Sequence, residues 1–223
     1  LLDSNIEVIL TANNGFNKLL DLYSVEKKVV HIQKCNVQVE EDISAVFKFI
    51  NKKGIKVDAV INNFAFTYFS EEGEIKGDPE NISKIFETNY LGVSIIFEYL
   101  LSNIKPNKDK QTKVVNILSN ALKTLNASNQ HYIASKAATK SLSEFYAKNF
   151  SHLLTINNVC PGLMKSNLTN NRFDDVVDQI EEITPLKRLA SPEEVAKLIV
   201  YLSTDSPPSL CGQTIFIDGG RSL

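Results

Sequence analysis

Short apolar runs alternate along the chain with longer stretches in which apolar residues recur at helical spacing. Runs of four to six apolar residues predict buried strands, and a period between three and four predicts helices. The predicted strands are 6–10, 29–32, 57–61, 114–118, 153–159 and 214–217. The predicted helices are 16–23, 42–52, 79–100, 130–150 and 191–202. This alternation, with strands that are apolar throughout, predicts a parallel sheet covered by helices on both faces.

Several helix boundaries are marked by local residues. The sequence Ser191-Pro192-Glu193-Glu194 predicts a helix start with a serine N-cap, a proline in the first turn and a capping box. Pro79 predicts another start, Gly54 predicts a stop, and Gly92 suggests a bend inside 79–100. No long period repeats and no low-complexity linker divides the chain. We therefore expect a single domain over residues 1–223.

Polar or turn-forming residues follow five of the predicted strands. In parallel α/β sheets the ligand binds beyond the carboxyl ends of the strands. The residues at those ends are Asn13-Asn14, Asn36, Asn62-Asn63, Ser119-Asn120 and Pro161-Gly162. The sequence therefore predicts a ligand site at this edge of the sheet.

Composition excludes several classes of function. A chain of 223 residues with 43% hydrophobic residues can bury one sizeable core. The net charge of −2, with lysines scattered among acids, gives no reason to expect a nucleic-acid partner. No apolar run approaches the roughly 18 residues of a membrane span, and no signal peptide is recognisable. We expect a cytoplasmic protein with no membrane partner.

The three cysteines, Cys35, Cys160 and Cys211, are odd in number and lack metal-ligand spacing. All three lie in or beside apolar stretches. We expect buried, reduced thiols and no metal site.

Tyr132 and Lys136 are the first candidates for chemistry. They are four residues apart in the predicted helix 130–150, so they share one face, and Ser119 lies thirteen residues before the tyrosine. A nearby ammonium lowers the pKa of a phenol from its usual value near 10, which would make a proton donor for neutral pH. The spacing alone is weak, because Tyr23 and Lys27 repeat it.

The surrounding motifs resemble those of the short-chain dehydrogenase/reductase family over nearly the whole chain. The matching segments, in order, are Cys35-Asn36-Val37, Ile61-Asn62-Asn63-Phe64-Ala65, Asn89 in ETNYLGV, VVNILS ending at Ser119, Tyr132 with Lys136, and Asn157 to Gly162. The segments PLKRLASPEEVAKLIVYLS and GQTIFIDGG are most similar to the 3-oxoacyl-carrier-protein reductase-like branch.

The resemblance implies a doubly wound, Rossmann-like parallel α/β fold and NAD(P)-dependent interconversion of a carbonyl and an alcohol. It implies that Tyr132 is the general acid/base, and that Lys136 lowers the pKa of the phenol and binds the nicotinamide ribose. Ser119 would donate a hydrogen bond to the substrate oxygen, and Asn89 would help to hold a water that connects the lysine to solvent. Each has an alternative: a turn former at Ser119, a structural tie at Asn89 and a packing aromatic at Tyr132.

The resemblance also implies a set of cofactor-binding residues, namely Asn13, Asn36, Val37, Asn62, Tyr132, Lys136, Pro161, Gly162, Leu163 and Ser166. Asn62 would lie under the adenosine ribose, and the Asn36 carbonyl would accept from the adenine amine, where the family usually has a carboxylate. Pro161 to Leu163 would line the nicotinamide, and Ser166 would bind its carboxamide. Ala12-Asn13-Asn14 offers neither an acid for NAD nor an arginine for NADP, and the absence of repulsion favours NADP over NAD.

The sequence departs from the family at its start. The family opens with a strand and a Gly-x-x-x-Gly-x-Gly turn whose amides bind the pyrophosphate, and here Gly15 and Gly54 are isolated. That strand would lie between those ending at Asn13 and Asn62, and without it two apolar strands keep unpaired backbone groups. We expect that the natural protein carries such an amino-terminal segment. A non-catalytic regulatory or scaffold member of the fold is the alternative.

Two further segments leave their roles open. The aromatic stretch FAFTYF, which begins at Phe64, is either a wall of the substrate site or core packing. The polar stretch 165–184 would be the lid over a small-molecule carbonyl or alcohol substrate and is a candidate for disorder without ligand. By resemblance we expect a homotetramer or homodimer that associates through helix 130–150. The identity of the substrate is open.

Overall fold

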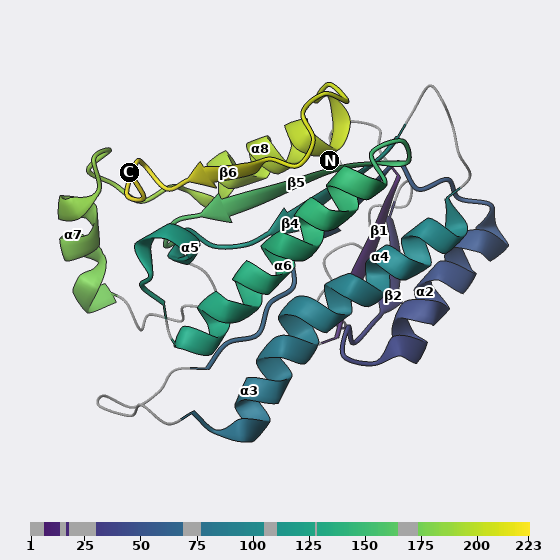
Figure 1. Ribbon diagram of the computed structural model, residues 1–223, viewed down its shortest axis with the longest axis horizontal. Coiled ribbons are helices and arrows are strands. Elements are labelled where there is room, and N and C mark those ends of the chain that lie inside the picture. Colours follow the sequence, from purple (N-terminus) through teal and green to yellow (C-terminus); the bar gives the residue numbers. More distant parts are fainter. Residues whose placement is uncertain are drawn as a thin grey trace. The chain divides into compact units, whose positions relative to one another are not determined.

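The computed structural model describes residues 7–13, 17, 30–68, 77–104, 111–127, 129–164 and 174–223. The strands are β1 (Val8–Ala12), β2 (Val30–Lys34), β3 (Ala59–Asn62), β4 (Thr112–Ile117), β5 (Leu154–Pro161) and β6 (Thr214–Ile217) (Figure 1). The helices are α2 (Glu40–Lys53), α3 (Pro79–Phe86), the π-helix η2 (Glu87–Leu91), α4 (Gly92–Asn103), α5 (Ala121–Thr124), α6 (Gln130–Asn149), α7 (Asp174–Ile183) and α8 (Pro192–Thr204). The predicted helix 16–23 falls outside the described residues except at Asn17.

All described strand pairs are parallel, as the sequence predicts. They form two sheets, one with the order β1-β2 and one with the order β3-β4-β5-β6. Among the described residues, β1 and β3 each keep one edge without a partner strand. The strand expected between those ending at Asn13 and Asn62 stays a prediction. The chain divides into two compact units, 1–56 with 91–103, and 57–90 with 104–223.

The first unit contains β1, β2, α2 and α4. Helix α2 ends at Gly54, whose φ of 66° is left-handed, so the predicted stop is confirmed. Phe47 of α2 stacks on Tyr99 of α4 with 5.6 Å between ring centroids. Gly92 opens α4, and a Cβ there would lie 2.9 Å from the carbonyl oxygen of Val37. The turn after β2 therefore packs directly against the start of α4.

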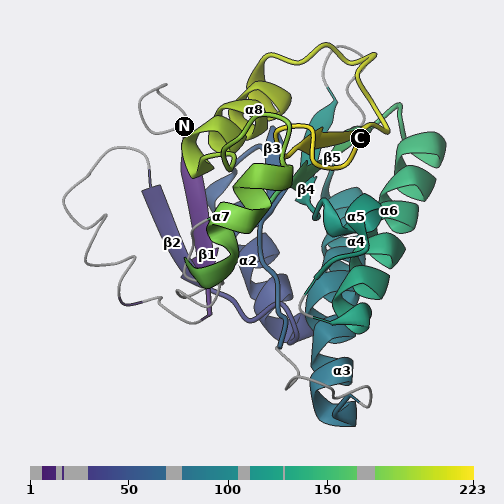
Figure 2. The same cartoon turned by 90° about the vertical axis from the view of Figure 1, so that its left-hand side faces the viewer.

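In the second unit, helices cover both faces of the four-stranded sheet. Neighbouring residues of a strand point to opposite faces. Val115 of β4 packs in a cluster with Val195 and Leu202 of α8, whereas Asn116 donates to Ser143 of α6 at 2.9 Å. Helices α6 and α8 therefore lie on opposite faces, with β4 and β5 between them (Figure 2).

A row of polar side chains crosses the face of this sheet that α6 covers. Asn62, Asn116, Asn158 and Thr214 occupy the same register on β3, β4, β5 and β6. Asn62 donates to Asn116 at 2.7 Å, Asn116 to Asn158 at 3.4 Å, and Asn158 to Thr214 at 3.3 Å. We call these four residues the amide row. It satisfies buried polar groups within the sheet, which would otherwise be costly.

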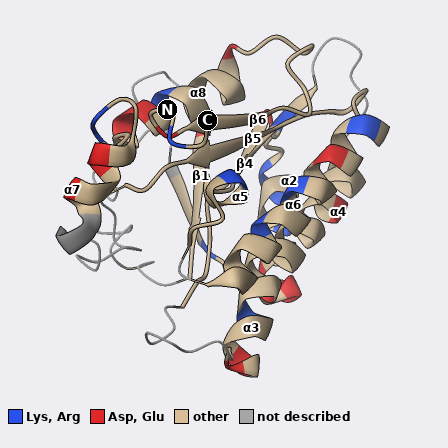
Figure 3. Ribbon diagram, turned by 60° about the vertical axis from the view of Figure 1, so that its left-hand side comes forward, with Lys and Arg blue, Asp and Glu red and all other residues tan. Residues whose placement is uncertain are grey.

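Helix α6 matches the predicted bounds within one residue, but the character of its faces was not foreseen. Its buried positions include Ser135, Thr139 and Ser143, whose hydroxyls meet the polar groups beneath the helix. Its outer face carries Phe145, which is 57% exposed. Lysines and one glutamate are marked along α6 in Figure 3, and Lys140 and Glu144 form an ion pair four residues apart on this helix.

Two local features differ from the expected pattern. The predicted helix 79–100 is interrupted by the π-helix η2, so the irregularity expected near Gly92 is a π-helical turn just before it. Part of the polar stretch 165–184, expected to lack order without ligand, forms helix α7. Val177 and Thr184 are buried and Ile180 is half-buried, so an apolar stripe was present in the sequence.

Asn116→Ala should destabilise the protein by about 2–4 kcal/mol, because it leaves the amides of Asn62 and Asn158 and the Ser143 hydroxyl short of partners. Asn149→Ala, which removes an exposed amide at the end of α6, should cost less than about 0.5 kcal/mol. Urea unfolding followed by circular dichroism measures both. Equal midpoints for the two variants would contradict a stabilising role of the amide row.

Candidate active site

The structure brings Ser119, Tyr132 and Lys136 together at the start of α6. Ser119 follows β4, and its side chain lies close enough to Tyr132 to act on the phenol and lower its pKa. The Lys136 Nζ lies 5.7 Å from the centroid of the Tyr132 ring and donates to the carbonyl oxygen of Ile117 at 2.8 Å. The helical turn between the two residues therefore places the ammonium beside the phenol, as their spacing predicts.

Asn129 fixes the first turn of α6. As the N-cap, its Oδ1 accepts from the backbone N–H of Tyr132 at 2.8 Å. Its Nδ2 donates to the Thr67 hydroxyl at 3.2 Å and to the Tyr68 carbonyl at 2.7 Å. This residue is not among the predicted site residues, although an asparagine just before a predicted helix is a common cap. One amide thus positions both the tyrosine and the loop that follows β3.

Asn89 lies in the π-helix and ties the same loop to α6. Its Oδ1 accepts from the Phe66 N–H at 2.8 Å, and its Nδ2 donates to the Phe66 carbonyl and to the Ser135 hydroxyl, both at 3.0 Å. The hydroxyl of Thr139 donates to the Asn89 carbonyl at 2.8 Å. These bonds engage every polar atom of the side chain. The Asn89 side chain therefore links the loop after β3 to α6, which is a structural role. Its role in holding a water stays a prediction.

Burial governs the proton affinities of the tyrosine and the lysine. Burial raises the pKa of Tyr132 to about 12, although the hydrogen bond with Ser119 acts in the opposite direction. Burial also lowers the pKa of Lys136 to about 8. The prediction of a lowered phenol pKa, which rests on the charge of the lysine alone, is therefore wrong. In the structure desolvation is the larger effect, so near neutral pH the phenol holds its proton.

The expectation of buried, reduced thiols is confirmed for Cys35 and Cys160, while Cys211 is half-buried, and all three are free. Cys160 is fully buried beside Tyr132 and Lys136, and burial raises its pKa to about 11. It is therefore a protonated, inaccessible wall of the site.

The predicted cofactor residues of the second unit follow β3 and β5. Asn62 is only 4% exposed and belongs to the amide row. Pro161 ends β5, Gly162 donates to the Ile217 carbonyl at 3.1 Å, and Leu163 is half-buried. These residues lie at the same carboxyl edge as Ser119, since Asn120 donates its N–H to the Pro161 carbonyl at 2.9 Å.

The remaining predicted cofactor residues lie elsewhere in the chain. Asn13 is exposed after β1, and Asn36 and Val37 follow β2, all within the first unit. The Asn36 Oδ1 accepts from the Gln38 N–H at 3.2 Å, so this oxygen already closes an Asx turn. Ser166 lies outside the described residues.

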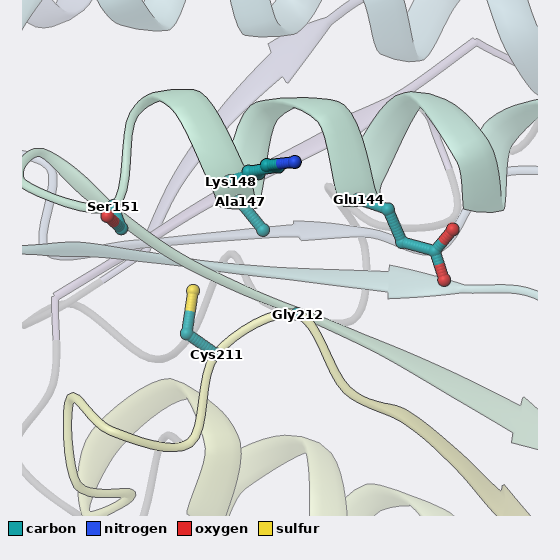
Figure 4. Close-up of a pocket in the computed structure, with 6 residues that line it drawn as sticks. All are labelled: Glu144, Ala147, Lys148, Ser151, Cys211 and Gly212. Carbon is teal, nitrogen blue, oxygen red and sulfur yellow. The ribbon is translucent and has the colours of Figure 1, made fainter.

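No group of three or more His, Cys, Asp or Glu residues in the described part of the chain could hold a metal ion. No described helix is both long and apolar enough to cross a membrane. A hollow of about 270 Å³ is lined by Glu144, Ala147, Lys148, Ser151, Cys211 and Gly212 (Figure 4). At roughly 1.5 Å per helical residue it lies about 20 Å along α6 from Tyr132, so it is separate from the candidate site.

The family model described as enoyl-(acyl carrier protein) reductase matches residues 2–222. This chain belongs to the short-chain dehydrogenase/reductase family. The 3-oxoacyl-[acyl-carrier-protein] reductase of Rickettsia felis is 29% identical over 220 residues, covering 97% of this chain and 86% of that protein. The corresponding reductase of Staphylococcus epidermidis is 26% identical over 191 residues, covering 85% of this chain and 77% of that protein.

Solved structures share the fold of this short-chain dehydrogenase/reductase. The Pseudomonas aeruginosa RhlG/NADP active-site complex superposes with a TM-score of 0.89 at 21% identity, covering 100% of this chain and 89% of that one. The 3-ketoacyl-(acyl-carrier-protein) reductase from Brucella melitensis complexed with NADH gives 0.82 at 20% identity, covering 97% and 88%. The predicted Rossmann-like fold is confirmed.

Membership of the family also confirms the predicted enzyme class, an NAD(P)-dependent oxidoreductase. The alternative of a non-catalytic scaffold is therefore disfavoured, because the serine, tyrosine and lysine of the motif are all present and lie near one another.

The lowered pKa of Lys136 predicts how stability changes with pH. Between its folded value of about 8 and the ordinary value of 10.5, the unfolded chain binds the proton and the folded chain does not. Stability therefore rises with pH in that window. The difference in the free energy of unfolding between the wild type and Lys136→Met should therefore shift in favour of the wild type by about 1 kcal/mol or more when the pH rises from about 7.5 to about 9.5.

Urea unfolding at both pH values measures this gain, with Lys148→Met, at an exposed site of the same helix, as the control for loss of a charge. A difference between wild type and Lys136→Met that does not change with pH would show that the amine is not desolvated.

Proposed function

We propose that this protein reduces a carbonyl to an alcohol with hydride from NADPH, and that Tyr132 donates the proton. The observation that carries the proposal is the placement of Tyr132 at the start of α6, with the Lys136 Nζ 5.7 Å from its ring centroid and the Ser119 side chain acting to lower the pKa of its phenol. A phenol that holds its proton near neutral pH is an acid ready to protonate an oxygen that gains negative charge.

Each residue has a separate task in this proposal. Ser119 and Tyr132 together hold the substrate oxygen by hydrogen bonds. The nicotinamide supplies the hydride when it is bound. As the proton leaves Tyr132, the Ser119 hydrogen bond and the Lys136 ammonium stabilise the phenolate. The raised pKa of Tyr132 keeps the phenol protonated near neutral pH, which is the form that donates the proton in the reduction.

A 3-oxoacyl thioester is the substrate class that we propose. Two curated relatives are named for the reduction of 3-oxoacyl chains on a carrier protein, and they align over most of this chain. An enoyl thioester is the second candidate, because the family model carries that description. Two hydrogen-bond donors on one oxygen suit the reduction of a ketone, where charge develops on that oxygen.

We propose NADP as the cofactor, with NAD as the alternative. The residues expected to hold it are the ten that the family resemblance implies, from Asn13 to Ser166. The homotetramer or homodimer, the cytoplasmic location and the single domain over 1–223 stay predictions.

Tyr132→Phe should lower the rate of NADPH oxidation with a 3-oxoacyl thioester by at least about 10²-fold, because it removes the general acid and keeps the ring. Tyr201→Phe, at a residue 44% exposed on α8, is the matched control and should leave the rate unchanged. The decrease in absorbance of NADPH measures both variants.

If Tyr132→Phe oxidises NADPH as fast as the wild type, the tyrosine is not the general acid. The same assay with an enoyl thioester separates the two substrate classes, and turnover confined to the enoyl substrate would replace the carbonyl proposal.

Asn13→Asp should shift the preference from NADPH towards NADH by at least about 10-fold in the ratio of kcat/KM values. A carboxylate there would repel the 2′-phosphate of NADP and accept from the 2′-hydroxyl of NAD. Asn13→Ser, which adds no charge, is the control. An unchanged ratio in Asn13→Asp would remove Asn13 from the proposed cofactor set.

A further inference from the structure

Two buried polar side chains meet at the carboxyl edge of the four-stranded sheet, next to the candidate site. Asn120 follows Ser119 directly, and Asp218 follows β6. The Asn120 Nδ2 donates to the Asp218 Oδ2 at 3.2 Å, and both residues are only 6% exposed. Residues 98 positions apart in the sequence are thus joined in a dry environment, where such a bond is strong and its loss is costly.

The bond crosses the end of β5, which lies between β4 and β6. Gly162 occupies the crossing point: a Cβ there would lie 2.9 Å from the Asp218 Cβ and 3.7 Å from the Asn120 Nδ2. The backbone adds two bonds, from the Asn120 N–H to the Pro161 carbonyl and from the Gly162 N–H to the Ile217 carbonyl. The turn that follows β5 is therefore enclosed between the turns that follow β4 and β6.

The second oxygen of the carboxylate holds the turn after β6. The Asp218 Oδ1 accepts from the Gly220 N–H at 3.1 Å, within a turn in which Gly219 and Gly220 have φ values of 67° and 86°. The Gly219 carbonyl accepts from the Leu186 N–H at 3.1 Å, so the segment after α7 is attached to the same turn. Both oxygens of Asp218 thus accept a hydrogen bond, one from the Asn120 side chain and one from the Gly220 backbone.

We propose that Asn120 and Asp218 are a positioning pair that fixes Ser119 relative to the Pro161-Gly162 turn. This inference rests on the proposed function, in which Ser119 holds the substrate oxygen and that turn borders the nicotinamide. Neither residue of the pair touches the reacting atoms. The pair sets the separation between the hydride donor and the carbon that receives it, and a misplacement of about 1 Å can cost on the order of 10²-fold in rate.

Exchanging the two residues tests whether the hydrogen bond between them matters, or whether each position needs its own residue type. In Asn120→Asp two carboxylates face each other, so the hydrogen bond is replaced by repulsion. In the double variant Asn120→Asp/Asp218→Asn the donor and the acceptor change places. The amide oxygen at position 218 still accepts from the Gly220 N–H, and its nitrogen donates back to position 120.

The test measures kcat, the KM values for NADPH and the carbonyl substrate, and the deuterium isotope effect on kcat with NADPH labelled at the transferred position. Asn120→Asp should lower kcat at least about 10-fold, change each KM less than about 3-fold and raise the isotope effect, because hydride transfer becomes slower. The double variant should recover kcat to within about 3-fold of wild type. Asn149→Asp, an exposed change of the same kind on α6, is the control and should match wild type.

Melting temperatures are measured for every variant, so that loss of fold is separated from loss of alignment. Should Asn120→Asp fail to fold, Asn120→Ala takes its place, since it removes the bond without adding repulsion. A double variant as slow as the single one, or a kcat loss without a rise in the isotope effect, overturns the pairing alone. A wild type that does not turn over the 3-oxoacyl thioester, or whose rate equals that of Tyr132→Phe, overturns the proposed function and this inference with it.

Discussion

The contact between α6 and the four-stranded sheet is made by hydrogen bonds, and the candidate site depends on it. Ser143 meets the amide row through Asn116, and Lys136 binds the backbone of β4 at its end. Apolar side chains can pack in several rotations of a helix at similar cost, whereas hydrogen bonds with fixed donors and acceptors select one. The rotation of α6 about its axis is thus set along its length. Because Tyr132 sits in the first turn, that rotation determines that its hydroxyl faces Ser119.

The same burial that fixes the helix also sets the chemistry of the site. Removing the phenol and the ammonium from water disfavours both charged forms, so the two pKa values move in opposite directions, that of Tyr132 up to about 12 and that of Lys136 down to about 8. A tyrosine in this state is an acid that needs a developing negative charge nearby before it releases its proton. Ser119 is the group that opposes the rise, since its hydrogen bond lowers the pKa of Tyr132. A bound substrate would therefore meet a proton donor, Tyr132, together with Ser119, which stabilises the phenolate that the proton transfer leaves behind.

Local patterns in the sequence predicted the elements well. Strand β6 has the predicted bounds, and α8 begins at the predicted capping box. The π-helix was missed because its hydrogen bonds depend on how Asn89 is held by a loop and by another helix. The raised pKa of Tyr132 was missed for a similar reason: the charge of Lys136 is visible in the sequence, but the burial of both groups is a product of tertiary packing. The partners Asn120 and Asp218 could not be found, since nothing local relates two residues so far apart.

These omissions share a physical cause, because the edge of the sheet is occupied by side chains that each serve several partners. Asn129 caps Tyr132 and holds the loop after β3, Asn89 holds that loop and α6, and Asp218 joins two turns. A buried polar group whose hydrogen bonds are all formed stabilises one arrangement of the segments around it. The same group with one hydrogen bond missing no longer favours that arrangement. Single substitutions here change stability and alignment together. The contribution of each side chain to alignment can therefore be isolated only by exchanges that keep the number of hydrogen bonds constant, and the Asn120–Asp218 pair permits such an exchange because an amide and a carboxylate have nearly the same shape.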